Sequence, residues 1–183
     1  MKLAFLIAVI LTVCPPLAGQ SFYPEKAKRQ KIELVGGYGY FSLREVKDAY
    51  LYERTESTGL IWGGIKFNPA PKFSLILTGG YEKTTLFPKG VVENDSLFIS
   101  SWLALAKLNY TYYQQNRFEL YISAATGLHY LNYNTLSESN TEFKFAEELI
   151  LLGIRYEWEL LCLYLEFGKS DLALCKAGMG IKL

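Results

Sequence analysis

From about residue 31 onward, apolar and polar residues alternate in short segments, a pattern typical of β-strands whose two faces meet different surroundings. In the closing stretch one face carries Cys175, Ala177, Met179, Ile181 and Leu183. The other face carries Lys176, Gly178, Gly180 and Lys182. A strand in a soluble sheet turns its polar face to open water, where glycine has no particular use. The pattern indicates a wide apolar surface on one side of the strand and a crowded, charged space on the other.

Breaks rich in turn residues divide the chain into segments of strand length. The predicted strands cover residues 31–41, 58–67, 73–82, 97–112, 118–131, 144–158, 160–167 and 172–183. Long breaks fall at 42–57, 83–96 and 132–142, whereas the breaks between them are short. In an up-and-down arrangement, alternate breaks lie at opposite ends of the sheet. The sequence therefore predicts an all-β fold, an eight-stranded antiparallel up-and-down transmembrane β-barrel with long external loops at one end.

The less apolar strand faces carry most of the charged residues of the predicted strands. These polar positions are Glu33, Lys66, Glu82, Lys107, Glu119, His129, Arg155, Glu157, Glu166, Lys176 and Lys182. Apart from the histidine, they balance acids against bases. Unpaired charges inside a narrow barrel are costly, and eight strands leave an interior that side chains just fill. We therefore predict a polar, plugged lumen, with glycines that leave room for long side chains and apolar faces that contact membrane lipid.

The N-terminus has the layout of a secretory signal peptide. Lys2 is followed by an apolar run and then by Pro15, Pro16 and small residues. We predict a cleaved signal peptide at 1–20, a flexible polar lead-in at 21–30 and the barrel at 31–183. Cys14 leaves a lipoprotein signal as an alternative, although Val13 stands where a small residue is expected.

Charge and cysteine content narrow the function. The chain has 19 basic and 18 acidic residues, so removal of Lys2 leaves 18 of each. A neutral chain gives no electrostatic reason to expect a nucleic-acid partner. Without a CxxC pair or a Cys/His cluster, no metal site is predicted. A register that sets Leu163 opposite Cys175 places the two remaining cysteines, Cys162 and Cys175, on opposite faces, although a one-residue slip would bring them together.

Segments such as "VGGYGYF" and "KAGMGIKL" complete a pattern that resembles the small outer-membrane β-barrels of Gram-negative bacteria, the OmpX-like proteins and the transmembrane part of OmpA. The resemblance covers about residues 31–183. It implies insertion by the barrel-assembly machinery, and we therefore expect the protein in the cell outer membrane. The long external loops would meet any surface partner. The resemblance implies no cofactor.

Some small barrels are enzymes, so the sole histidine, His129, needs consideration. A lipid A deacylase would show His-x-Ser, but Leu131 occupies the serine position. An acyltransferase would need Ser and an acid nearby; Ser137, Ser139 and Glu142 follow at a spacing that is not diagnostic. No catalytic residue is predicted, and His129 is interpreted as a hydrogen-bonding residue. Two alternatives stay open: a secreted soluble lipocalin-like barrel that binds an apolar ligand, and a lipid-modifying barrel enzyme.

Overall fold

The computed structural model describes residues 32–40, 52–88, 96–134, 139–170 and 173–183. The strands are β1 (Ile32–Tyr40), β2 (Tyr52–Ser57), β3 (Leu60–Ala70), β4 (Phe73–Pro88), β5 (Leu97–Gln115), β6 (Phe118–Asn134), β7 (Ser139–Trp158), β8 (Leu161–Ser170) and β9 (Cys175–Lys182). None of the described residues belongs to a helix long and apolar enough to cross a membrane. The predicted signal peptide and lead-in, 1–20 and 21–30, lie outside the described residues.

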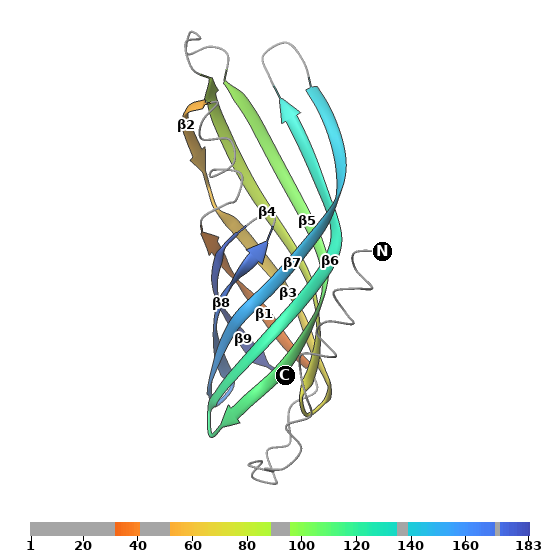
Figure 1. Ribbon diagram of the computed structural model, residues 1–183, viewed down its shortest axis with the longest axis vertical. Helices are drawn as coiled ribbons and strands as arrows, with labels where there is room; N and C mark the ends of the chain where they lie inside the picture. Colours follow the sequence, from red (N-terminus) through yellow and green to blue (C-terminus); the bar gives the residue numbers. More distant parts are fainter. Residues whose placement is uncertain (1–31, 41–51, 89–95, 135–138, 171–172) are drawn as a thin grey trace.

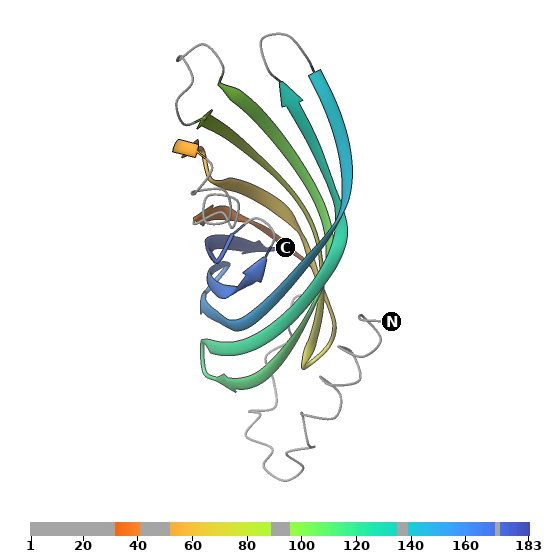
Figure 2. The same cartoon turned by 45° about the horizontal axis from the view of Figure 1, so that its top comes forward.

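The strands close into a ring (Figures 1 and 2). β2 and β3 both pair with β4 and are separated only by Thr58 and Gly59, where glycine adopts a φ of 71° that other residues rarely take. They act as one interrupted strand, because Thr58 N still donates to Lys83 O at 2.9 Å. β1 pairs with both β3 and β9 and so closes the sheet. The ring of eight antiparallel strands confirms the predicted fold class.

The two faces of the wall have opposite polarity. On the outside, Leu77 is 50% exposed and Leu163 is 52% exposed. On the inside, Glu33 is 1% exposed and Glu119 is 2% exposed. A soluble barrel that binds an apolar ligand requires the reverse arrangement, so the described side chains contradict the lipocalin-like alternative. The arrangement suits a lipid surround instead.

Aromatic side chains border the apolar outer band. Toward the loop end, Tyr81 and Trp102 have ring centroids 4.6 Å apart, and Tyr130 and Phe143 have theirs 4.9 Å apart. These four are consecutive register partners across β4, β5, β6 and β7. At the turn end, Phe73 packs against its register partner on β5. From Phe73 to Tyr81, β4 advances about 26 Å along its axis; at a tilt of about 40° this is roughly 20 Å of height, near the thickness of an outer-membrane apolar band.

The strands extend well into the predicted loops, which corrects the predicted boundaries. Residues 52–57 form β2, 83–88 belong to β4, and 132–134 and 139–142 belong to β6 and β7. The Ser-, Thr- and Asn-rich composition indicated loops, but backbone pairing between neighbouring strands satisfies these segments as sheet. Residues 41–51, 89–95 and 135–138 lie outside the described part. As a result β4–β7 rise above β8 and β9 and give the barrel an uneven rim (Figure 1).

A β-bulge interrupts the alternation of β7. Tyr121 pairs with Gly153, but Ser123, two residues later, pairs with Ile150, so β7 contains one extra residue. Leu151 and Leu152 both lie on the outer face, with 65% and 36% exposure. Residues of β7 on the two sides of the bulge therefore follow opposite parities.

Glycines on the inner face make room for large side chains. A Cβ on Gly178 would lie 2.7 Å from the Trp62 ring, and one on Gly180 would lie 2.5 Å from Glu33 Oε1 and 3.0 Å from the Tyr164 ring. Glycine at these positions is therefore a packing requirement. It accounts for the half-glycine polar face of β9.

The register of the last hairpin differs from the prediction. Cys162 pairs with Gly180, and Cys175 pairs with Phe167. β8 continues to Ser170, so the hairpin turns later than expected and the pairing moves by four residues. An even shift keeps every side chain on its face. Both thiols are free, with Cys162 buried inside and Cys175 on the outer face.

Candidate functional site: the charged interior

Four charged side chains form a closed square across the barrel. Lys107 Nζ lies 2.5 Å from Glu166 Oε1 and 3.3 Å from Glu148 Oε1. Lys176 Nζ lies 2.5 Å from Glu148 Oε2 and 3.2 Å from Glu166 Oε2. Tyr121 Oη donates to Glu166 Oε1 at 2.7 Å. Each ammonium bridges two carboxylates and each carboxylate two ammoniums, so this central square compensates its own charge.

Arg155 is the hub of a second network, nearer the short-turn end. Its Nη2 lies 3.2 Å from Glu33 Oε2, and its Nη1 lies 3.1 Å from Glu119 Oε2 and also contacts Glu157. Its Nε donates to Tyr164 Oη at 3.0 Å. These partners come from β1, β6, β7 and β8, so one planar guanidinium joins four strands.

Two lysines complete the Arg155 network. Lys66 Nζ lies 3.7 Å from Glu33 Oε2, and Lys182 Nζ lies 2.7 Å from Glu157 Oε2. The network thus pairs three bases with three acids. Together with the central square, the two groups hold five of each sign among the described residues.

The structure places the predicted polar residues on the inner face. Those at most 6% exposed are Glu33, Lys66, Glu82, Lys107, Glu119, His129, Arg155, Glu166 and Lys176. Glu157 and Lys182 are less enclosed, with side-chain exposures of 24% and 17%. Glu82 stands apart from both networks, nearer the loops, and accepts a hydrogen bond from Ser57 Oγ at 2.6 Å.

Glu148 is the interior residue that the sequence reasoning missed. It is 4% exposed and binds both lysines of the central square. If β7 alternated regularly, Glu148, seven residues before the inward-facing Arg155, would lie on the outer face. The bulge at Leu151 and Leu152 reverses that parity. In the sequence, the bulge is indicated only by the two adjacent leucines, because the apolar positions before them and after them follow opposite parities.

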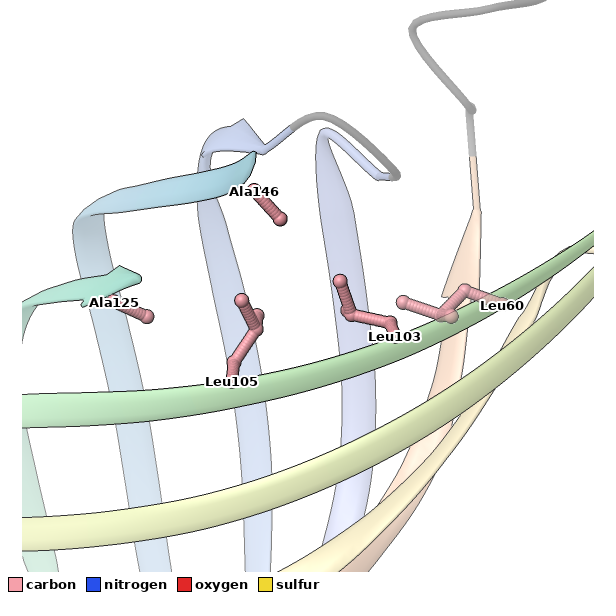
Figure 3. Packing of buried hydrophobic residues seen from close by; sticks show 5 residues of the cluster. All are labelled: Leu60, Leu103, Leu105, Ala125 and Ala146. Carbon is pink, nitrogen blue, oxygen red and sulfur yellow. The ribbon is translucent and has the colours of Figure 1, made fainter. Parts of the chain in front are cut away.

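An apolar layer packs beside the central square. Figure 3 shows the layer toward the loops, in which side chains of β3, β5, β6 and β7 meet across the interior. Its members are Leu60, Leu103, Leu105, Ala125 and Ala146. Beside the square, a cavity of about 20 Å³ is lined by Trp62 and by members of the square, which is room for about one water molecule.

The arrangement around His129 does not form a catalytic set within the described residues. His129 lies on the inner face, with Leu103 and Lys144 as its register partners. Glu142 lies 2.9 Å from Lys144 Nζ, and Ser139 Oγ contacts Asn132. Ser137 lies outside the described residues. No group of three or more metal-ligating His, Cys, Asp or Glu side chains occurs in the described part of the chain.

No protein-family model and no curated protein sequence matches the chain. The N-terminal β-barrel domain of Pseudomonas aeruginosa OprF superimposes with a TM-score of 0.52 at 13% sequence identity, covering 84% of this chain and 96% of that one. This chain has the fold of the small outer-membrane β-barrels. The resemblance expected from the sequence is thereby confirmed for the fold of the barrel.

A second similar structure is Ail, the attachment invasion locus protein of Yersinia pestis. It gives a TM-score of 0.47 at 11% identity, covering 84% of this chain and 95% of that one.

Proposed function

We propose that the protein is an integral outer-membrane barrel with a lumen closed to ions. The observation that carries the proposal is the polarity of the wall, which has ion-paired charges inside and an apolar band bordered by aromatics outside. A wall with this polarity is suited to a lipid bilayer. The closed ring gives every backbone N–H and C=O group of the strands a hydrogen-bond partner within the sheet, as the bilayer requires. Export by the 1–20 signal peptide and insertion by the barrel-assembly machinery belong to the proposal.

The filled interior supports the closed lumen. The central square and the Arg155 network span the barrel from opposite strands, and the cavity beside the square has a volume of only about 20 Å³. An ion crossing the barrel would have to displace these pairs. We propose that the protein is not an enzyme.

The first test is fractionation followed by gel electrophoresis of unheated and boiled samples. Expressed with residues 1–20 in a Gram-negative host, the protein should be recovered in the outer membrane and should change mobility on boiling. Reconstituted into planar bilayers, it should conduct no steady current. A soluble periplasmic product without a mobility shift would refute the membrane assignment, and stable single-channel currents would refute the closed lumen.

A specific observation favours a surface-interaction role in addition. β7 pairs with β8 only from Glu148 to Trp158, so the upper part of β7, residues 139–147, extends beyond the end of β8. Phe143 and Phe145 on this stretch are 72% and 60% exposed. A strand that extends beyond its neighbour is suited to pairing with an extended segment of another protein. The raised sheet, with the external loops, would then form the contact surface at the cell exterior.

Proline substitutions test this role. In an antiparallel edge strand, backbone N–H groups point alternately toward the neighbour and away from it. Of Thr141→Pro and Glu142→Pro, one therefore blocks the edge and the other disrupts the pairing with β6. Linear peptides that bind the folded barrel are first selected from a displayed library. Of the two proline variants, the one that keeps the boiling-dependent shift is still folded, and the selected peptides should no longer bind it. Full binding by that variant would refute pairing at this edge.

A further inference from the structure

A row of polar side chains follows the aromatic border on the outer face, one step nearer the loops. Lys83 of β4 pairs with Ser100 of β5, and Ser100 pairs with Asn132 of β6. Each of the three stands two residues from a ring of the border, on the side of the loops, and so shares the outer face with that ring. This polar row therefore lies just above the apolar band, at the level of lipid head groups.

The ammonium of Lys83 has no carboxylate partner within the described part of the chain. It lies 5.9 Å from the centroid of the Phe98 ring, and none of the ion pairs between described residues involves it. The side chain is exposed. Glu56 of β2 is one step further toward the loops, as the register partner of Thr85, and has a contact of its own. A positive charge beside a hydroxyl and an amide suits an anion with several oxygen atoms, such as a phosphate group.

Below the aromatic border, small residues open a path down the wall. Gly79 and Ala104 are register partners directly beneath Tyr81 and Trp102, whose ring centroids are 4.6 Å apart. The described atom nearest to a Cβ on Gly79 would be the Leu103 carbonyl oxygen, at an ordinary contact distance of 3.7 Å. Packing among the described residues therefore does not require glycine at this outward position. A glycine inside a strand often marks the close approach of a ligand.

The path leads into a hollow at the level of the apolar band. Its volume is about 390 Å³, within the range of about 300–1,000 Å³ of ligand pockets. On β4 and β5 the hollow is lined by Leu75, Ala106 and Leu108, and Ala124 of β6 continues this apolar lining. Ala106 is the next outward residue of β5 after Ala104, so the path and the hollow are continuous. The polar residues of the lining belong to β6, β7 and β8, away from the path.

The polar row, the path and the hollow are stacked like the parts of a membrane amphiphile. From Lys83 to Leu75, β4 advances about 26 Å along its axis; at a tilt of about 40° this is roughly 20 Å of height. The polar row crosses β4, β5 and β6, which are two inter-strand spacings, or about 10 Å. A polar row of this width suits a phosphorylated sugar better than a single glycerophosphate head.

We infer that this face of the barrel binds one phosphorylated glycolipid. The phosphate binds Lys83, and sugar hydroxyls form hydrogen bonds with Ser100 and Asn132. One acyl chain passes over Gly79 and Ala104 into the hollow. The inference rests on the proposed location of the barrel in the membrane, with its loops at the cell exterior, so the lipid belongs to the outer leaflet. It is independent of partner binding at the upper part of β7.

Native mass spectrometry of the folded, signal-cleaved protein tests the site. The protein is released from detergent with equal amounts of lipid A, a phosphorylated and acylated disaccharide, and phosphatidylglycerol, an anionic lipid with a smaller head. We expect one retained lipid A, preferred over phosphatidylglycerol.

Three variants test the parts of the site separately. Lys83→Gln should lower the affinity for lipid A about fivefold, as expected for one lysine beside an anionic head group. Ala106→Leu should fill the hollow and reduce retention as well. Asn132→Ala should weaken the preference for lipid A and leave the retention of phosphatidylglycerol unchanged, because it removes a contact to the sugar and no charge.

Two matched variants control for general effects. Lys144→Gln removes a half-exposed ammonium near the loops on the inner face, and Ala177→Leu enlarges an exposed outward alanine of β9. Both should retain lipid A like the unmodified protein. The boiling-dependent shift establishes folding for every variant. If Ala106→Leu does not fold, Lys83→Gln, which changes an exposed side chain, decides the test.

Three results would overturn the inference. Retention of lipid A unaffected by Lys83→Gln and Ala106→Leu would mean that the lipid binds elsewhere. Equal retention of the two lipids would mean that the polar row recognises a negative charge and not a sugar. Lipid-independent dimers that dissociate in Ala106→Leu would identify this face as an interface between two copies of the chain. An unmodified protein without the boiling-dependent shift would instead refute the membrane barrel, and the inference with it, so the two failures are distinguishable.

Discussion

Glu148 and Arg155 lie seven residues apart on β7, yet both side chains point into the barrel. An odd separation on a regular strand would place them on opposite faces. The extra residue at Leu151 and Leu152 brings both inside, where Glu148 joins the central square and Arg155 forms its own network. The bulge is therefore a condition for charge compensation in the lumen.

Deletion of Leu151 should prevent folding of the barrel. It would restore regular alternation and turn Glu148 to the outer face, leaving Lys107 and Lys176 short of a carboxylate. The boiling-dependent mobility shift after refolding into vesicles should disappear. Leu151→Ala, which keeps the extra residue, should retain the shift. Folding of the deletion variant with unchanged stability would show that the bulge does not set the facing of Glu148.

Glu148→Gln should destabilise the barrel by about 3 kcal/mol, because it leaves two buried ammonium groups with one carboxylate between them. Equilibrium unfolding in urea, followed by tryptophan fluorescence in vesicles, measures the change. Glu142→Gln on the same strand provides the control. Its ion pair with Lys144 is about half exposed on both sides, so its loss should cost less than about 1 kcal/mol. Similar losses for the two variants would contradict a specific role of the central square.

Arg155→Lys should lower stability by about 2–4 kcal/mol although it conserves the charge. An ammonium cannot reproduce the fork by which Arg155 reaches Glu33, Glu119 and Tyr164 together. The same urea titration measures the effect. Arg117→Lys, in the exposed β5–β6 turn, makes the same exchange and should change stability by less than about 0.5 kcal/mol. If Arg155→Lys left the stability unchanged, the positive charge alone would suffice in this network.

Gly153→Ala should cost about 1–3 kcal/mol through overpacking. The new Cβ would lie 2.2 Å from the ring of Tyr121, which is 2% exposed and has its hydroxyl hydrogen bonded to Glu166. At Gly63, on the outer face, the described residue nearest to a new Cβ is Val35, whose carbonyl oxygen lies 3.6 Å away. Gly63→Ala should therefore leave the urea midpoint unchanged or raise it slightly. Equal effects would mean that Tyr121 moves aside without cost.

Much of the wall could be predicted from alternation because each strand has one apolar outer face and one face in a crowded polar interior. One face of β9 indicated a crowded, charged interior because it alternates lysine with glycine, at Lys176, Gly178, Gly180 and Lys182. The loops were harder to predict. The Thr- and Asn-rich ends of β4, β6 and β7 have a loop-like composition, and only pairing with one another makes them sheet.

By itself, the sequence determined the all-β class, the number of strands in the ring and which residues of most strands share a face, because the period of two is a local property of the chain. Only the tertiary structure decided how the charges pair. Arg155 and Glu33 are 122 residues apart and meet because the ring closes between β1 and β9. The bulge in β7 and the register of the last hairpin likewise depend on neighbouring strands, whose alignment no single segment specifies.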